Sequence, residues 1–295
     1  MSIFRSAGSF PGRAGSRVVA VVVAIMVLAV SGCASSESSD PAVAFNSGRG
    51  VDEIRESGTV RIGVYPDRPP FGVVDDHGVY SGFDIDYANR IGEDLGVDVE
   101  FVPVSADTRV PTVESGEADI ILATFTVNSA RLGVVDFADP YMKVSLGVVS
   151  PDSAGITDPV QLNGARVAVV RGTTAETYIS SRYPDVRAVK VDKNSEATAA
   201  LLDGRATAWL VDNSAALAWT GTQAGFSTGI TSLGDQEVIA AAVAKGNSSL
   251  LEWLNSQMPE LNGEQFFHDS YERNLAPVLG AQLPADQLLV ESAAG

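Results

Sequence analysis

Cysteine, histidine and positive charge are all scarce in this sequence of 295 residues. The single cysteine, Cys33, excludes an intramolecular disulfide, and with only His77 and His268 beside it a cysteine–histidine metal cluster is excluded too. Lysine and arginine total 20 against 37 aspartate and glutamate, so the formal net charge is −17. Because nucleic-acid binding draws on clustered basic side chains, we expect no nucleic-acid partner.

Nucleotide-binding motifs are also missing. The chain contains neither a phosphate-binding P-loop nor the glycine-rich motif of dinucleotide-binding folds. We therefore expect no cofactor, no metal and no ATP-hydrolysing part within this chain.

Long hydrophobic runs are absent as well. The longest, residues 18–30, has 13 residues, which is too short to cross about 30 Å of hydrocarbon comfortably. It follows a basic stretch without acidic residues, so residues 1–32 have the composition of a signal peptide. Small residues come directly before Cys33 and a serine-rich stretch follows, an arrangement that resembles a bacterial lipoprotein box. The resemblance implies a lipid on Cys33, a flexible tether over residues 33–50 and a location at the extracytoplasmic face of the cell membrane.

From residue 51 onward, β-rich runs alternate with helical stretches, which is typical of an α/β fold. The first series predicts strands at 59–64, 97–102 and 118–123, and helices at 85–95 and 110–114. The second predicts strands at 165–170, 189–191, 208–211 and 238–244, and helices at 175–180, 197–202, 214–219, 248–257 and 263–274. The two series share a rhythm but no evident sequence repeat, so we predict two α/β lobes.

One motif opens the first long helix: Gly-Phe-Asp-Ile-Asp-Tyr at residues 82–87. Asp84 and Asp86 do not share a helix face, so we interpret Asp84 as the N-cap and Asp86 as a charge that favours the helix dipole, and not as a metal pair. The motif resembles the family 3 extracellular solute-binding proteins of ABC importers. Further matching motifs follow in the family's order, at residues 65–71, 116–119, 123–131, 135–141, 171–176 and 210–212.

The resemblance covers about residues 60–280 and implies a type II periplasmic-binding-protein-like fold. Each of its two lobes is a central sheet flanked by helices, and one amino acid is clamped between them. We assign residues 51–143 and 241–283 to lobe 1, 144–240 to lobe 2 and 284–295 to a C-terminal tail, with two crossing strands near 143–149 and 237–241. The resemblance also implies a monomer that delivers its ligand to ABC permease subunits.

The residues at the matched positions have the chemistry that an α-amino acid requires. The Arg131 guanidinium can hold a carboxylate through two parallel hydrogen bonds. Thr173 and Thr174 stand where a strand gives way to a helix, which suits an anion or plain N-capping. Asp212, at a strand end, suits either a ligand ammonium or the cap of the next helix. The family motifs add Thr124, Thr126 and Phe71 to the expected ligand-binding set.

Selectivity is expected to depend on Tyr65 and Arg68. Relatives that bind basic amino acids usually have an acid and an aromatic ring at these places. A cation there disfavours a cationic ligand, and we also expect Arg109 and Arg171 near the cleft. The segment 105–111 resembles glutamate- and aspartate-type binders, so we predict glutamate, followed by aspartate and glutamine. The alternative is that Arg68 pairs with Asp67 or with solvent.

Enzyme functions are less well supported. Residues 225–229 match the Gly-x-Ser-x-Gly pattern of a hydrolase nucleophile elbow, but a helix is predicted before them and an extended segment after them, the reverse of that motif. We expect no catalytic residue and predict a binding protein. Two alternatives remain open: a ligand-sensing module that signals through a membrane partner, and a dehydratase on the same fold.

Overall fold

The computed structural model describes residues 47–290, which belong to one compact unit, Val43–Gly295. The predicted signal peptide, Cys33 and residues 33–46 of the predicted tether lie outside the described residues. No helix within residues 47–290 is long and apolar enough to cross a membrane.

Lobe 1 contains a five-stranded sheet in the order β5-β1-β6-β13-β7. Its strands are β1 (Thr59–Val64), β5 (Asp98–Pro103), β6 (Ile120–Ile121), β7 (Val135–Phe137) and β13 (Ala242–Ala244). The last strand pairs antiparallel with both neighbours, whereas β1 pairs in parallel with β5 and β6. A small antiparallel sheet joins β2 (Asp67–Arg68), β3 (Gly72–Val74) and β4 (Tyr80–Ser81). The helices are α1 (Val51–Ser57), α2 (Phe83–Leu95), α3 (Arg109–Glu114), α4 (Ser129–Leu132), α8 (Ser248–Gly263) and α9 (Phe266–Asn274).

Lobe 2 repeats this plan with the strand order β10-β9-β11-β8-β12. Its strands are β8 (Met142–Pro151), β9 (Arg166–Val170), β10 (Arg187–Val191), β11 (Ala208–Asp212) and β12 (Phe226–Ile239). The helices are η1 (Pro159–Leu162), α5 (Thr174–Arg182), α6 (Asn194–Leu202) and α7 (Asn213–Thr222). The two-lobed α/β fold predicted from the sequence is thereby confirmed.

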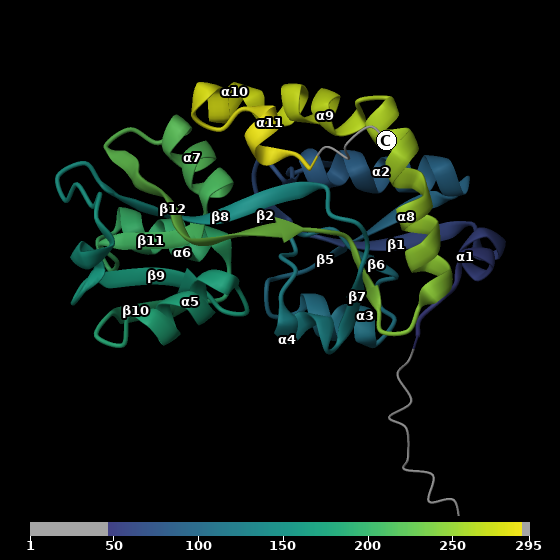
Figure 1. Cartoon of the computed structure of the whole chain (residues 1–295), viewed down its shortest axis with the longest axis horizontal. Helices are drawn as coiled ribbons and strands as arrows, with labels where there is room; N and C mark the ends of the chain where they lie inside the picture. The colour runs from purple at the N-terminus through teal and green to yellow at the C-terminus, as the bar shows by residue number, and fades with distance from the viewer. Residues whose placement is uncertain (1–46, 291–295) are drawn as a thin grey trace, which may run out of the picture. The chain divides into compact units, whose positions relative to one another are not determined.

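The lobes are joined by β8 and β12, which run side by side between them (Figure 1). They pair antiparallel from Met142 and Ile239 to Pro151 and Phe226, with several register shifts. After α9, the chain forms α10 (Ala276–Leu279), which contacts α7 of lobe 2, then η2 (Gly280–Gln282) and α11 (Ala285–Leu288). Leu289 is buried and bridges to Met142, so residues 284–290 of the predicted tail pack on the connecting strands.

Aromatic side chains pack α2 and α9 of lobe 1 against the start of the connecting strand β8. Phe83 and Tyr87 of α2, Tyr141 before β8 and Phe267 of α9 have ring centroids 5.1 to 6.2 Å apart. Burying these large rings supplies much of the hydrophobic stabilisation of this region. The packing places the first turn of α2 against Tyr141, directly before the connecting strand β8.

Several element predictions need correction. The N-cap of α2 is Gly82, not Asp84, which lies in the first turn of the helix. The N-cap position requires glycine, because a Cβ there would lie 2.4 Å from the Phe71 carbonyl oxygen. The predicted strand at 238–244 is two strands, since the chain leaves the lobe 2 sheet at Ile239 and joins the lobe 1 sheet at Ala242. Residues 263–274 are not one helix, because α8 ends at Gly263 and α9 begins at Phe266. Strand β12 begins at Phe226, so residues 225–229 have the extended continuation that argued against a nucleophile elbow.

Candidate ligand site between the lobes

Arg131 extends from lobe 1 toward lobe 2. The Asn128 side chain caps the short helix α4 by accepting from the Arg131 backbone N–H at 2.9 Å. This hydrogen bond fixes the Arg131 backbone from which the guanidinium extends. Its guanidinium donates to the carbonyl of Thr126 at 2.6 Å and, across the interlobe boundary, to that of Gly172 at 3.0 Å. Burial, and then the nearby Arg109 guanidinium, lower the pKa of Arg131 to about 9. A bound anion would relieve this unfavourable concentration of positive charge.

Arg109 is the second cation of the site and, unlike half-buried Arg131, it is fully buried. It is 2% exposed and donates to the carbonyl of Ala123 at 2.9 Å. Its guanidinium carbon lies 4.4 Å from the Phe125 ring centroid, and that of Arg131 lies 4.6 Å from the same centroid. The two guanidiniums therefore share one aromatic ring, a favourable position for a desolvated cation. Burial is the main cause that lowers the pKa of Arg109.

Arg68 reaches from the β2 strand of lobe 1 to lobe 2. It is 4% exposed, and it donates to Asp212 Oδ2 at 2.5 Å and to Asn194 Oδ1 at 3.1 Å. The interpretation that Arg68 pairs with Asp67 or solvent is therefore wrong. Asp212 stands at the N-cap position of α7 but makes no side-chain cap hydrogen bond, because its carboxylate is directed to Arg68. Arg68 Nε is buried without a hydrogen-bond partner.

Thr173 and Thr174 lie at the start of α5 in lobe 2. The Thr173 hydroxyl accepts from the Glu176 backbone N–H at 3.2 Å, so Thr173 is the N-cap of this helix. Thr174 lines the pocket described below. Arg171, in contrast, forms an exposed ion pair with Asp192 and does not join the buried cations.

Thr124 has a conformation that is unusual for a non-glycine residue, with φ at 41°. Its backbone N–H donates to Asp84 Oδ2 at 2.9 Å, and its own Oγ1 is buried without a partner. The other oxygen of Asp84 accepts from the Tyr141 hydroxyl at 2.8 Å. Asp84 is 1% exposed, and burial raises its pKa to about 6 despite these hydrogen bonds. Asp84 thus supports the strained segment that leads to Thr126 and Arg131.

The remaining predicted residues have different surroundings. Tyr65 is buried, and its ring centroid lies 5.4 Å from the guanidinium carbon of Arg68 and 5.5 Å from that of Arg109. Thr126 is 3% exposed beside Arg131. Phe71 is fully buried and packs edge-on against Phe83, so it supports the loop from the core side.

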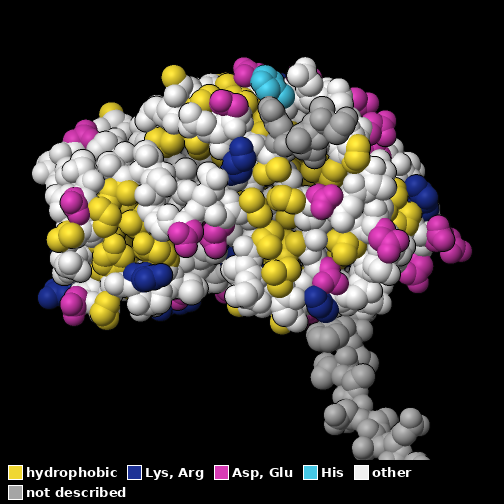
Figure 2. All heavy atoms as spheres, viewed as in Figure 1, with side chains coloured by type: hydrophobic (Ala, Val, Ile, Leu, Met, Phe, Trp, Pro, Cys, Tyr) yellow, Lys and Arg dark blue, Asp and Glu magenta, His cyan; other side chains and the backbone are white. Residues whose placement is uncertain are grey.

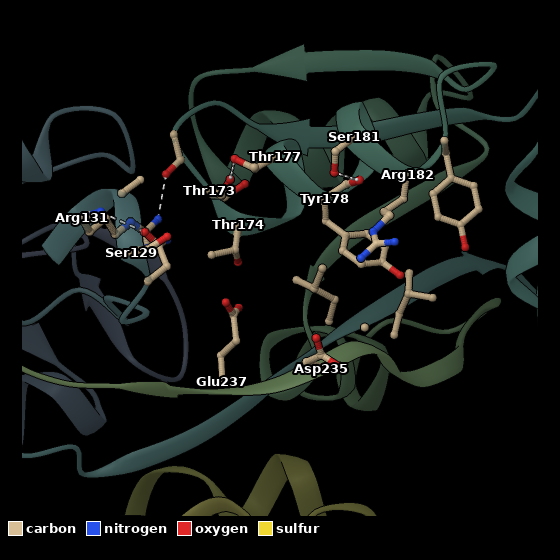
Figure 3. Close-up of a pocket in the computed structure, with 17 residues that line it drawn as sticks. Ser129, Arg131, Thr173, Thr174, Thr177, Tyr178, Ser181, Arg182, Asp235 and Glu237 are labelled. Carbon is tan, nitrogen blue, oxygen red and sulfur yellow. Dashed lines mark hydrogen bonds between the residues drawn. The ribbon is translucent and has the colours of Figure 1, made fainter. Parts of the chain in front are cut away.

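A pocket of about 910 Å³ opens between the lobes (Figure 3). Arg131 of α4, Thr173 and Thr174 of α5 and Glu237 of β12 line it, and Figure 3 shows the Glu237 carboxylate pointing toward Thr174. Burial raises the pKa of Glu237, an effect that Arg131 opposes. A second pocket of about 430 Å³ is lined by Tyr65, Asn194 and other residues of both lobes.

Sequence reasoning did not single out Glu237 or Asn194 as site residues, and it gave Asp84 only a local role. Glu237 lies on a connecting strand, and Asn194 opens a helix of the opposite lobe from Arg68. Neither position carries a local motif. An acid on the strand predicted to cross between the lobes was the one signal that pointed to Glu237.

The charge of the site contrasts with that of the surface. Figure 2 shows Asp and Glu side chains spread over the visible face, with fewer Lys and Arg. Between the lobes, the guanidiniums of Arg68 and Arg109 are buried and that of Arg131 is half-buried. The Asp212 carboxylate is paired with Arg68. This arrangement suits a zwitterion, whose carboxylate meets the cations and whose ammonium meets Asp212. Within residues 47–290, no cluster of three or more His, Cys, Asp or Glu could hold a metal ion.

The two-lobed α/β fold, with a pocket between the lobes, is that of the type II periplasmic solute-binding proteins. The model of the bacterial extracellular solute-binding proteins, family 3, matches residues 60–276, and the chain belongs to this family. The resemblance identified from the motifs is thereby confirmed. Members of the family are solute-binding proteins, and their extracellular designation fits an extracytoplasmic location.

Particular relatives bind different amino acids. The ABC transporter glutamine-binding protein of Bacillus subtilis is 25% identical over 86% of this chain and 95% of its own length. The L-cysteine receptor of Neisseria gonorrhoeae has 43% identity and a TM-score of 0.80 over 82% of this chain and 100% of that chain. The cysteine-binding protein of Campylobacter jejuni has 42% identity and the same TM-score over 82% and 99%. Other relatives are described as binding arginine or cystine.

Proposed function

We propose that this chain is the substrate-binding protein of an ABC importer, anchored by a lipid on Cys33, which captures a polar L-amino acid and delivers it to the permease. The observation that carries the proposal is the placement of half-buried Arg131 and buried Asp212 on opposite lobes. The two groups are close enough for Asp212 to raise the pKa of Arg131. A ligand that bridges them favours the closed arrangement of the lobes over an open one.

Each end of an α-amino acid has a matching group. The carboxylate would bind the planar guanidinium of Arg131, with the Thr173 end of α5 adding its N-terminal dipole. The ammonium would bind the Asp212 carboxylate. Among the described residues, this carboxylate accepts a hydrogen bond only from Arg68. Neither end requires a catalytic group, so capture and release are sufficient to explain the site.

The ligand side chain is expected to carry no positive charge. Arg68 and Arg109 stand beside Tyr65 on the lobe 1 side of the cleft, and both are almost fully buried. A ligand ammonium or guanidinium there would face like charges in a desolvated site. Arg68 Nε and Thr124 Oγ1 are buried without partners, so a side chain with a polar acceptor gains further hydrogen bonds.

We rank L-cysteine first among such ligands, ahead of the glutamate that the sequence placed first. Two structures with 42% and 43% identity are described as cysteine-binding proteins, whereas the glutamine-binding relative is 25% identical. The charge argument keeps glutamate, aspartate and glutamine as the next candidates.

A ligand scan tests the proposal. The chain from residue 34 onward is stripped of ligand by unfolding and refolding, then heated with each of the twenty amino acids and cystine, the thiols kept reduced. A ligand at 100 times its Kd adds about 2.7 kcal/mol of stability, which is about 5–11 °C in Tm for a chain of this size. A rise with cysteine, glutamate, aspartate or glutamine supports the proposal. A rise only with lysine, arginine or histidine refutes the selectivity, and no rise with any compound refutes amino-acid binding.

A further inference from the structure

Asp67 makes a contact that the ligand clamp described above does not use. It lies on β2 of lobe 1, but its carboxylate faces the beginning of α6 in lobe 2. Oδ2 accepts from the Ser195 backbone N–H at 3.2 Å and from the Ser195 hydroxyl at 3.3 Å. Oδ1 accepts from Asn194 Nδ2 at 3.4 Å. One side chain thus makes three contacts with the opposite lobe.

Helix α6 needs such a partner. Its N-cap residue, Lys193, makes no side-chain hydrogen bond to the helix, whereas α5 and α8 are capped by their own Thr173 and Asn247. The first backbone N–H groups of a helix have no partner within the helix, and an acceptor with negative charge stabilises them. Asp67 supplies this acceptor from the other lobe.

The neighbouring Arg68 ties the same contact to the ligand site. Its two terminal nitrogens donate to Asn194 and Asp212, so Asn194 bonds both members of the Asp67–Arg68 pair. The pair is held by β2, which pairs with β3 through Asp67 to Val73 and Arg68 to Gly72. The small sheet therefore presents a carboxylate and a guanidinium to lobe 2 in fixed relative positions.

We propose that Asp67 is a positioning residue that closes the clamp by capping α6 of the opposite lobe, so that part of the ligand-free population is already closed. The effect on ligand affinity rests on the proposed function, whereas the effect on lobe closure does not. When the lobes separate, the Asp67 carboxylate and the first N–H groups of α6 both return to water. The closed state therefore gains a capping interaction that an open state lacks.

Lobe closure is measured in ligand-free protein by single-molecule energy transfer between dyes on introduced cysteines. Val79 of lobe 1 is 60% exposed and Leu202 of lobe 2 is 54% exposed, so Val79→Cys and Leu202→Cys place one dye on each lobe. The chain from residue 34 onward contains the whole compact unit and no other cysteine.

Four further variants on this background make the test specific. Asp67→Ala removes the cap, and Asp67→Asn keeps a good capping group without the charge. Asp76→Ala removes the same charge from an exposed residue of the same lobe. Gly172→Ala gives an open reference, because a Cβ there would lie 2.7 Å from the Asp107 backbone nitrogen of the other lobe.

We expect Asp67→Ala to lower the ratio of closed to open molecules about fivefold, the size of a typical N-cap contribution. Asp67→Asn should recover most of this loss, and Asp76→Ala should match the parent. A ligand found in the scan should dissociate faster from Asp67→Ala by the same factor, with its association rate unchanged.

An unchanged ratio in Asp67→Ala overturns the proposal, and so does a parent protein whose energy transfer equals that of Gly172→Ala. Equal losses in Asp67→Ala and Asp76→Ala would mean that net charge, and not the cap, controls closure, which also overturns it. If no amino acid binds, the proposed function fails, but the ligand-free ratios still decide the role of Asp67.

Discussion

Replacing Asp84 by asparagine should make the protein more stable at neutral pH. Asp84 is 1% exposed and accepts from the Thr124 N–H and the Tyr141 hydroxyl. Burial raises its pKa from 3.8 to about 6, more than these hydrogen bonds and the charges of Arg68 and Arg109 lower it. Asparagine has the same shape. Its oxygen can accept from Thr124, and its amide can donate to the Tyr141 oxygen.

The magnitude follows from the shift in pKa. Between about pH 4 and pH 6, folded Asp84 keeps a proton that the unfolded chain has released, so its contribution to stability decreases as the pH rises through this window. The rise in the Asp84 pKa from 3.8 to about 6 corresponds to about 3 kcal/mol, and above pH 6 the decrease is complete. Asp84→Asn carries no ionisable group there. It should equal the wild type at pH 4 and exceed it by up to about 3 kcal/mol at pH 7, or roughly 6–12 °C in Tm.

Urea unfolding of the wild type and of Asp84→Asn at pH 4, 5, 6 and 7 measures the difference in their free energies of unfolding. The contributions of all other titrating groups cancel in this difference. The matched control is Asp86→Asn, which removes the same charge two residues along α2. The Asp86 carboxylate accepts from Ser270, Arg273 and Asn274, so its replacement should give no gain at pH 7. A difference between Asp84→Asn and wild type that is constant from pH 4 to pH 7 would refute the reasoning.

Three further changes test the site and its supports. Arg131→Ala should weaken ligand binding by about 2–5 kcal/mol, roughly 30- to 5,000-fold in Kd by calorimetry, and Arg131→Lys should not restore it because lysine lacks the planar fork. Gly172→Ala should force the lobes apart and cost about 1–3 kcal/mol, roughly 5- to 150-fold in Kd; unchanged affinity would exclude close approach of the lobes at Gly172. Thr173→Ala should lose the α5 cap, about 1 kcal/mol or 2–4 °C in ligand-free Tm, and an unchanged Tm would show that the cap is dispensable.

The sequence alone determined the family, the two-lobed α/β class and most elements, since these depend on local periodicity and on motifs within a few residues. The strands at 59–64 and 208–211, for example, differ from β1 and β11 by at most one residue. Breaks set by the passage between lobes were not predictable. Ala240 and Ala241 fit a continuous strand by composition, but they separate two sheets.

The site residues divide in the same way. Short motifs predict Arg131 and Thr173 as site residues, and the helices that carry these two residues fix their positions. The partners of Asp67, Arg68 and Asp84 could not be assigned, and the local interpretations of these side chains were wrong or incomplete. Arg68 meets Asp212 across 144 residues of sequence, and Asp67 meets Ser195 across 128. Such charges find their partners only where the two lobes meet, because burial at that boundary removes water and leaves the opposite lobe as the source of hydrogen bonds.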